Sequence, residues 1–288
     1  MDIVGKVYCI DKQCALRTKL RIGDRVTALT KYGGNSRYLA IDADQLVRVP
    51  DRTDPAEATC FPETYLTAFQ ALHYGQSGNL RYRANALRGK TILLLGPLTT
   101  TLIAAFGQLS VIAGARYIYS PAKARHFEKI ESMGIVPLSE DPLDWFESLM
   151  GRVDLIISVN EEVIPMNQKL LSRSGEIVVV TQDGNILPKR ESNERLGRVV
   201  CSRASAQNKS RTHTLNVYNE WEENLANSKR DLAHIIGYLE ERLVVPNVIE
   251  RIPLNKVSRA HEILERKNVP GFVVCEPWLV SKSRAVML

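Results

Sequence analysis

The segment from Thr91 to Ser120 limits the possible folds of this chain more than any other stretch. It opens with an apolar run, Thr91 to Leu95, that is too short for a helix with a buried stripe. Such a run suits a strand covered on both faces of a parallel sheet. A glycine and a proline end it, apolar residues then recur at helical spacing from Leu98 to Ala113, and a second strand is predicted from Arg116 to Tyr119.

A strand, turn, helix and strand in this order form the first half of a doubly wound nucleotide-binding sheet. The first turn of such a unit carries glycines, because a diphosphate approaches bare backbone N–H groups at the helix N-terminus. Here only Gly96 remains, and the next positions hold Thr99, Thr100, Thr101 and Ile103. Their Cβ atoms fall where phosphate oxygens would approach the backbone, although threonine hydroxyls can themselves bind phosphate. Two interpretations therefore stay open: a nucleotide-binding site, or a sheet that no longer binds a nucleotide.

Composition narrows the class of protein. The 288 residues, 44% hydrophobic and 24% charged, fit one large or two ordinary globular domains. A net charge of +6 arises from scattered basic residues, so solubility rather than nucleic-acid binding is expected. No apolar run approaches the ~20 residues of a membrane span, and the N-terminal segment does not have the pattern of a signal peptide.

The cysteines and histidines are dispersed along the chain. The five cysteines show no CxxC pairing, which indicates a reducing, cytoplasmic location and argues against a disulfide framework or a structural zinc site. They are Cys9, Cys14, Cys60, Cys201 and Cys275. The five histidines show no paired spacing either, so no metal is expected.

Residues 1–50 alternate and turn like a small β domain. Strands are predicted within residues 4–10, 21–29, 36–41 and 46–50. The first strand begins almost at the initiator methionine, which would leave an unpaired edge. The sequence is therefore expected to lack strands upstream.

Four motifs in order give the chain a resemblance to a known family: G-x-V, IGDRV, YGGNSRYLAIDADQLVRVPD and EATCFPETYLTAFQAL. They resemble the medium-chain dehydrogenase/reductase superfamily, in its zinc-free quinone oxidoreductase and enoyl reductase branch. The resemblance runs from about Asp2 to Trp278 and implies an α/β fold, a Rossmann doubly wound parallel sheet plus a partial GroES-like β domain. The expected domains are residues 1–75 with 245–288 (GroES-like, incomplete at its N-terminus) and residues 76–244 (Rossmann).

The same resemblance places residues 65–68 beside a nicotinamide, with the hydroxyl of Thr67 contacting the cofactor. An alternative is that Thr67 bonds back to its own helix. Tyr65 is a candidate catalytic proton donor, and a buried structural tyrosine is the alternative. From the residues alone, a helix is predicted from Pro55, interrupted at Pro62, and a second from Tyr65 to Leu72.

Ser120 stands where a dinucleotide fold places its ribose-reading residue, and no Asp or Glu is present there. A hydroxyl followed by Lys123 and Arg125 near a helix N-terminus suits a 2′-phosphate, so NADPH is the expected cofactor. The alternative is that both cations belong to an ordinary solvated helix face.

The alternation of helices and strands continues after this segment. Helices are predicted at Phe127–Met133, Asp141–Met150, Val163–Leu171 and Trp221–Arg242, and strands at Val153–Ser158, Glu176–Thr181, around Val199 and in the GFVVCE run. Residues 182–214 are expected at the surface. The resemblance puts Asn160 and Thr181 near the cofactor, although an acidic pair follows Asn160 and would repel a phosphate.

Together these features favour an NADPH-dependent reductase that passes hydride to a small-molecule quinone, enone or related unsaturated carbonyl. Two alternatives stay open: a non-catalytic relative kept for binding or scaffolding, and a fragment of a longer enzyme. Because the superfamily commonly pairs its subunits through an edge of the Rossmann sheet, a homodimer is also expected.

Overall fold

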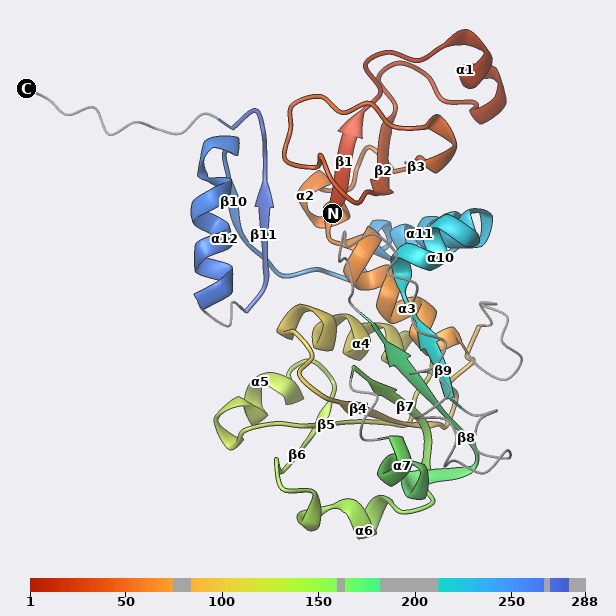
Figure 1. Cartoon of the computed structure of the whole chain (residues 1–288), viewed down its shortest axis with the longest axis vertical. Coiled ribbons are helices and arrows are strands. Elements are labelled where there is room, and N and C mark those ends of the chain that lie inside the picture. Colours follow the sequence, from red (N-terminus) through yellow and green to blue (C-terminus); the bar gives the residue numbers. More distant parts are fainter. Residues whose placement is uncertain (75–83, 160–163, 182–211, 267–269, 280–288) are drawn as a thin grey trace, which may run out of the picture. The chain divides into compact units, whose positions relative to one another are not determined.

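The computed structural model describes residues 1–74, 84–159, 164–181, 212–266 and 270–279 (Figure 1). The chain divides into two compact units. The β unit comprises the described residues of Met1–Leu66, Thr99–Thr101 and Leu225–Leu288, and the sheet unit comprises those of Thr67–Leu98 and Leu102–Asn224. The domain boundaries expected at residues 75 and 245 stay predictions.

The sheet unit is built on six parallel strands in the order β6-β5-β4-β7-β8-β9. The strands are β4 (Thr91–Leu95), β5 (Tyr117–Pro121), β6 (Val136–Leu138), β7 (Val153–Ser158), β8 (Leu171–Val180) and β9 (Thr212–Leu215). Counted along the chain, the order is 3-2-1-4-5-6, which is the doubly wound arrangement of dinucleotide-binding folds. The predicted Rossmann sheet is therefore confirmed.

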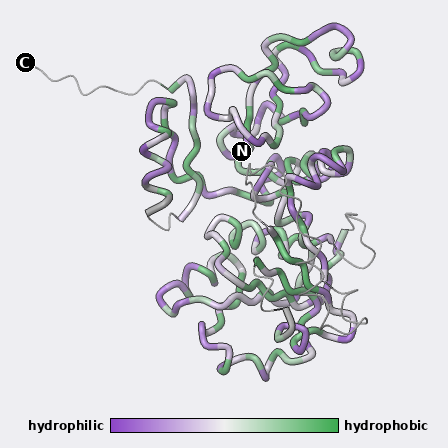
Figure 2. Tube along the Cα trace, viewed as in Figure 1, coloured by the Kyte–Doolittle hydropathy of each residue, from purple (hydrophilic) through white to green (hydrophobic). Residues whose placement is uncertain are grey.

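The central strands explain why this sheet forms. Ile92, Leu93 and Leu94 of β4 are at most 1% exposed, as are Ile156 and Ile157 of β7. Because both faces of these strands are covered, they contain continuous apolar runs rather than an alternating pattern. The strands predicted at Thr91–Leu95 and Val153–Ser158 match β4 and β7, and the hydropathy colouring is green along the sheet (Figure 2).

The described helices of the sheet unit are short, except for α4. They are α3 (Leu66–His73), which begins at the boundary of the units, α4 (Thr100–Ile112), α5 (Phe127–Glu131), α6 (Phe146–Leu149), α7 (Ile164–Asn167) and α10 (Val217–Glu223). The helix predicted from Leu98 to Ala113 is α4, shortened by a turn-forming segment at its start. The helix predicted over Asp141–Met150 is instead a 3-10 turn, Pro142–Asp144, followed by α6.

The last strand of the sheet differs from the prediction. Thr212–Thr214 were expected in a broken surface segment, but they belong to β9, whose residue His213 pairs with Val178 of β8. The four-residue strand alternates hydroxyl, imidazole and apolar side chains, so it lacks the apolar run that marked β4 and β7. The strand predicted around Val199 lies outside the described residues.

The β unit contains an antiparallel sheet β1-β2-β3 and a parallel pair β10-β11. Its elements are β1 (Asp2–Lys6), α1 (Lys12–Thr18), β2 (Arg25–Leu29), β3 (Val47–Arg48), α2 (Pro55–Thr59), a π-helix (Phe61–Tyr65), α11 (Leu225–Glu240), β10 (Val248–Ile252), α12 (Val257–Arg266) and β11 (Phe272–Cys275). The strand predicted within residues 36–41 is wrong, since this segment is a loop whose Tyr38 side chain is 64% exposed. Gly33 enters the loop at a φ of +88°, a left-handed conformation that directs the chain away from β2.

Two further helical features departed from expectation. Helix α1 has no buried residue, so its sequence carries no apolar periodicity, and only its N-cap Asp11, which accepts the N–H groups of Gln13 and Cys14, signals it. The single helix predicted from Trp221 to Arg242 is two helices, α10 and α11, separated at Asn224 by a non-helical backbone.

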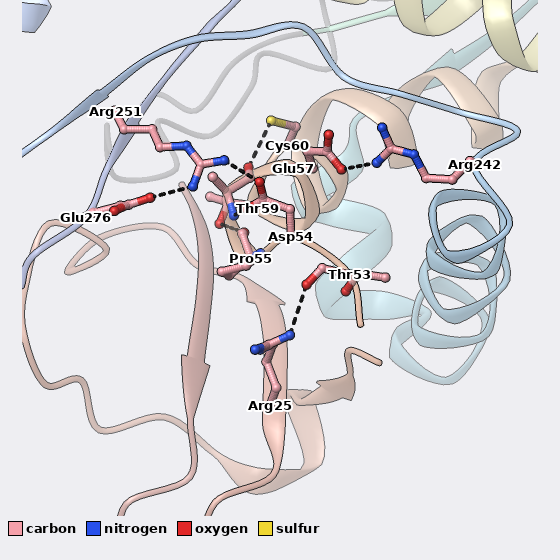
Figure 3. A network of polar contacts seen from close by, with 11 residues as sticks. Arg25, Thr53, Asp54, Pro55, Glu57, Thr59, Cys60, Arg242, Arg251 and Glu276 are labelled. Carbon is pink, nitrogen blue, oxygen red and sulfur yellow. Dashed lines mark hydrogen bonds and ion pairs between the residues drawn. The ribbon is translucent and has the colours of Figure 1, made fainter. Parts of the chain in front are cut away.

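Arginine–carboxylate pairs join the two ends of the sequence within the β unit (Figure 3). Asp54 caps α2 by accepting the Ala56 N–H at 2.9 Å and also pairs with Arg251 of β10. The second guanidinium nitrogen of Arg251 reaches Glu276 at 2.9 Å, and Arg242 pairs with Glu57 at 2.5 Å. Residues almost two hundred positions apart along the chain are thereby held together at the start of α2.

The Asp54 carboxylate gives a prediction about acid. Partial burial raises the pKa of Asp54, but the Ala56 N–H and the Arg251 guanidinium lower it more, so the pKa lies below the ordinary 3.8. A carboxylate whose pKa is lowered by folding stabilises the fold at pH values above its pKa in the unfolded chain. This contribution is lost as the pH falls through its pKa in the folded chain. Asp54→Asn, which keeps the helix cap, should lower the free energy of unfolding by about 0.5–1 kcal/mol at pH 7, and by progressively less as the pH falls below the unfolded pKa.

Urea unfolding at pH 7 and at a series of lower pH values measures this difference. Asp51→Asn is the matched control, because Asp51 is exposed and has no ion pair among the described residues. Equal losses for the two variants at pH 7 would contradict the role given to Arg251.

Candidate nucleotide-binding site

The turn after β4 depends on a glycine. Gly96 has a φ of +94°, and the Leu98 N–H donates to its carbonyl at 2.8 Å. A Cβ atom placed on Gly96 would lie 2.7 Å from Cγ2 of Val159. Any other residue would therefore meet both backbone strain and a steric clash.

This turn lies where the strand order reverses. β5 and β6 extend the sheet on one side of β4, and β7, β8 and β9 extend it on the other. Leu95 pairs with Ser158 at the last step of the β4–β7 ladder, so Gly96 and Val159 start the two loops that diverge there. In open α/β sheets, ligands bind outside the carboxyl ends of the strands at this switch point.

Three threonines follow the turn at the start of α4; they group with the β unit, whereas α4 from Leu102 onward belongs to the sheet unit. Helix α4 begins at Thr100, and the hydroxyls of Thr99 and Thr101 lie 3.1 Å apart. Thr99 is exposed, and Thr100 and Thr101 are half-buried. Hydroxyl donors beside the N–H groups of a helix N-terminus suit an anion. The donor set therefore fits a phosphate, even though the backbone is less accessible than in a glycine-rich turn.

The end of β5 supplies the next part of the site. Ser120 is 4% exposed, and just after β5 the Ala122 N–H donates to the Leu138 carbonyl at 2.9 Å. Lys123 and Arg125 follow and are exposed, and Arg125 Nε donates to His126 Nε2 at 3.2 Å. Neither cation has a carboxylate within 4.0 Å among the described residues. Both charges are therefore available to an anionic ligand.

Thr181 lies at the carboxyl end of β8, but its hydroxyl is already engaged. It donates to the Leu215 carbonyl at 3.4 Å and accepts from Nδ2 of Asn216 at 3.2 Å. The Thr181 N–H also donates to Leu215 at 2.9 Å. Thr181 thus fastens the ends of β8 and β9 together, and Asn160, the other residue expected here, lies outside the described residues.

The two residues expected beside the nicotinamide belong to different compact units. Tyr65 is 1% exposed in the β unit, and its ring stacks on Phe61 at 4.6 Å and on Phe272 at 6.4 Å. Thr67 is 6% exposed at the start of α3 in the sheet unit. This buried, stacked ring agrees with the alternative interpretation of Tyr65, a tyrosine with a structural role.

The structure thus brings Gly96, Ser120 and Thr181 to the same edge of one sheet, at the ends of β4, β5 and β8. Sequence reasoning missed Val159, which limits the space over Gly96, and Asn216. Asn216 links Thr181 to α10 by accepting the N–H groups of Tyr218 and Asn219. An asparagine just before an apolar–polar helix is an N-cap signal, so Asn216 could have been found.

The described part of the chain contains no metal-binding cluster and no disulfide. No group of three or more His, Cys, Asp or Glu side chains there could hold a metal ion. The four described cysteines are free, and burial raises the pKa of the Cys60 thiol. Within the same residues, no helix has the length and apolar character needed to cross a membrane.

Comparison with known proteins identifies the fold. No protein-family model and no curated protein sequence matches the chain. Among solved structures, a mycobacterial protein complexed with NADPH matches with a TM-score of 0.70 at 18% identity over 96% of this chain and 81% of that chain. The quinone oxidoreductase from Coxiella burnetii matches with 0.66 at 19% over 95% and 77%, and the CurK enoyl reductase with 0.67 at 19% over 96% and 77%. At these identities the likeness establishes a shared fold.

Proposed function

We propose that this chain, which has the fold of zinc-free medium-chain quinone oxidoreductases and enoyl reductases, binds NADPH and reduces a small quinone, enone or related unsaturated carbonyl. The observation that carries the proposal is the glycine turn at the switch point of the sheet, followed directly by a helix N-terminus with three hydroxyls. The structural neighbours include one that is solved with NADPH.

The roles of the chain's own residues follow from their positions. The left-handed turn at Gly96 keeps side-chain atoms away from the diphosphate, and Thr99, Thr100 and Thr101 offer hydroxyls and helix N–H groups to it. Lys123 and Arg125 stand after β5, where they would bind the 2′-phosphate that distinguishes NADPH from NADH. Ser120 would contact the adjoining ribose.

When bound, NADPH supplies a hydride from the nicotinamide ring. The acceptor carbonyl or alkene gains that hydride at carbon and a proton at the atom that carries the developing negative charge. The Tyr65 hydroxyl is the candidate donor of that proton, but its ring is stacked between Phe61 and Phe272 and 1% exposed. We therefore assign the proton to solvent water, and Tyr65 to the packing of the β unit.

The second candidate function is a non-catalytic relative that no longer holds the cofactor. Two observations favour it: the threonines in the phosphate turn, and the Thr181 hydroxyl that is already bonded to Leu215 and Asn216. Nucleotide binding separates the two candidates, because a scaffold without a cofactor site gains no stability from NADPH.

Titration with NADPH is the experiment that tests the proposal. At a concentration about a hundred times the dissociation constant, bound NADPH should stabilise the fold by ~2.7 kcal/mol, measured as a rise in melting temperature. No rise with NADPH or NADH would contradict the reductase function and support the scaffold.

Cofactor preference gives a second expected result. Lys123→Ala combined with Arg125→Ala should weaken NADPH binding by about tenfold or more and leave NADH binding nearly unchanged, since only NADPH carries the 2′-phosphate. Nicotinamide fluorescence measures both affinities. Arg152→Ala is the matched control, because Arg152 is an exposed cation next to the amino end of β7. Equal losses for the two cofactors would remove the 2′-phosphate assignment.

A further inference from the structure

An exposed cluster of aromatic rings lies on the β unit. Tyr8, Tyr38 and Trp278 come from the segments after β1, before β3 and after β11, and they are 75%, 64% and 60% exposed. The rings of Tyr8 and Tyr38 meet edge to face at 5.4 Å, and those of Tyr38 and Trp278 at 5.7 Å. We call these three residues the aromatic patch.

Contacts with the backbone hold the patch in place. Arg37 Nε donates to the Pro277 carbonyl at 3.2 Å, and the Arg37 guanidinium lies 4.9 Å from the centre of the Trp278 ring. At the base of Tyr8, the Gly23 N–H donates to the Val7 carbonyl at 2.8 Å. Ile22, the residue before Gly23, is 70% exposed. The ring contacts and these bonds therefore make the patch a built surface.

Basic residues flank the patch segments in the sequence, and one of them, Arg37, contacts the patch. Lys6, Arg21 and Arg37 are exposed and have no carboxylate within 4.0 Å in the described ranges. Among the carboxylates of the same segments, Asp24 pairs with Arg48 at 3.0 Å and Glu276 with Arg251 at 2.9 Å, and the Asp11 side chain accepts the N–H groups of Gln13 and Cys14. A ligand for this surface should thus be anionic as well as partly apolar.

Ring geometry decides between ligand classes. A nucleobase or another flat ring needs an open aromatic face. Here the rings are turned at 62° and 84° to one another, and Arg37 covers a face of Trp278. A second copy of the patch would bring unpaired cations together, which repel. Tyr and Trp side chains, apolar with one polar group, suit the headgroup level of a bilayer, where basic residues meet anionic lipids.

We propose that the aromatic patch docks this chain on the surface of an anionic membrane. The rings of Tyr8, Tyr38 and Trp278 insert among the headgroups, and Lys6, Arg21 and Arg37 face the lipid phosphates and carboxylates. This is a peripheral contact that does not depend on the proposed reductase activity, and its strength falls as salt screens the charges.

Trp278 reports the contact directly, because Trp145 and Trp221 are 7% and 4% exposed. Adding vesicles of phosphatidylcholine with phosphatidylserine to the full chain should shift the Trp emission to the blue and protect it from a soluble quencher. Vesicles of phosphatidylcholine alone should have a much smaller effect. Tyr8→Ser with Tyr38→Ser keeps the reporter and should weaken vesicle binding by about tenfold in co-sedimentation.

Leu143→Ser is the matched control, since Leu143 is 86% exposed in the sheet unit and its loss should leave binding unchanged. The proposal is overturned if the emission is unaffected by anionic vesicles, or if neutral vesicles bind equally well. It is also overturned if Leu143→Ser weakens binding as much as the double variant. A blue shift that grows with protein concentration in the absence of vesicles would instead identify the patch as an interface between copies.

Discussion

Replacing Gly107 by alanine is expected to destabilise the protein by about 1–3 kcal/mol, because the packing around this residue leaves no room for a side chain. Gly107 is buried in the middle of α4, and a Cβ atom there would lie 2.4 Å from the Met133 carbonyl oxygen and 3.2 Å from Cδ1 of Ile135. The first of these is a backbone atom, so the helix itself must move away from the segment that leads into β6. This close approach is what only glycine allows.

Gly237 of α11 is the matched control, since it is also a helical glycine but no atom lies within 4 Å of an added Cβ. Gly237→Ala should stabilise the protein by up to about 1 kcal/mol through helix propensity alone. Urea unfolding of both variants therefore gives opposite signs. Shifts of the same sign would contradict the packing of α4 against the segment before β6.

The parallel sheet could be predicted because its signal is local. The runs at Thr91–Leu95 and Val153–Ser158 are apolar on both faces, and each corresponds to one strand of the structure with the same bounds. The elements that were missed carry no periodic apolar signal. β9 is defined by pairing with β8, and α1 has no buried face, so neither has a periodic pattern of its own.

The candidate site was only partly predictable for the same reason. Gly96 was identified from its place after a strand, and its left-handed backbone agrees with that position. Val159 was missed because it enters the site through the strand order, and Asn216 because its N-cap signal marks the start of α10 and not the bond to Thr181. Spacing along the chain cannot show which loops meet at the carboxyl edge of a sheet, and strand order decides it.

Gly96 forms the turn after β4 and belongs to the proposed nucleotide site, so its replacement should affect both stability and NADPH binding. Two separate costs are expected for Gly96→Ala. The φ of +94° strains any residue with a Cβ by about 1–2 kcal/mol, and that Cβ lies 2.7 Å from Val159 Cγ2. Gly151→Ala isolates the first cost, because Gly151 has a φ of +69° with no atom within 4 Å of an added Cβ.

Gly96→Ala should therefore lower the free energy of unfolding by more than Gly151→Ala does, by about 1 kcal/mol or more for the clash. Adding Val159→Ala to Gly96→Ala should restore the stability lost to the clash, because it removes the Cγ2 atom that the added Cβ approaches. The loss caused by backbone strain should remain. NADPH titration of the same variants tests the function: Gly96→Ala should weaken binding by about tenfold or more, whereas Gly151→Ala should not. If Gly96→Ala bound NADPH as tightly as the unchanged chain, the nucleotide could not lie against this turn.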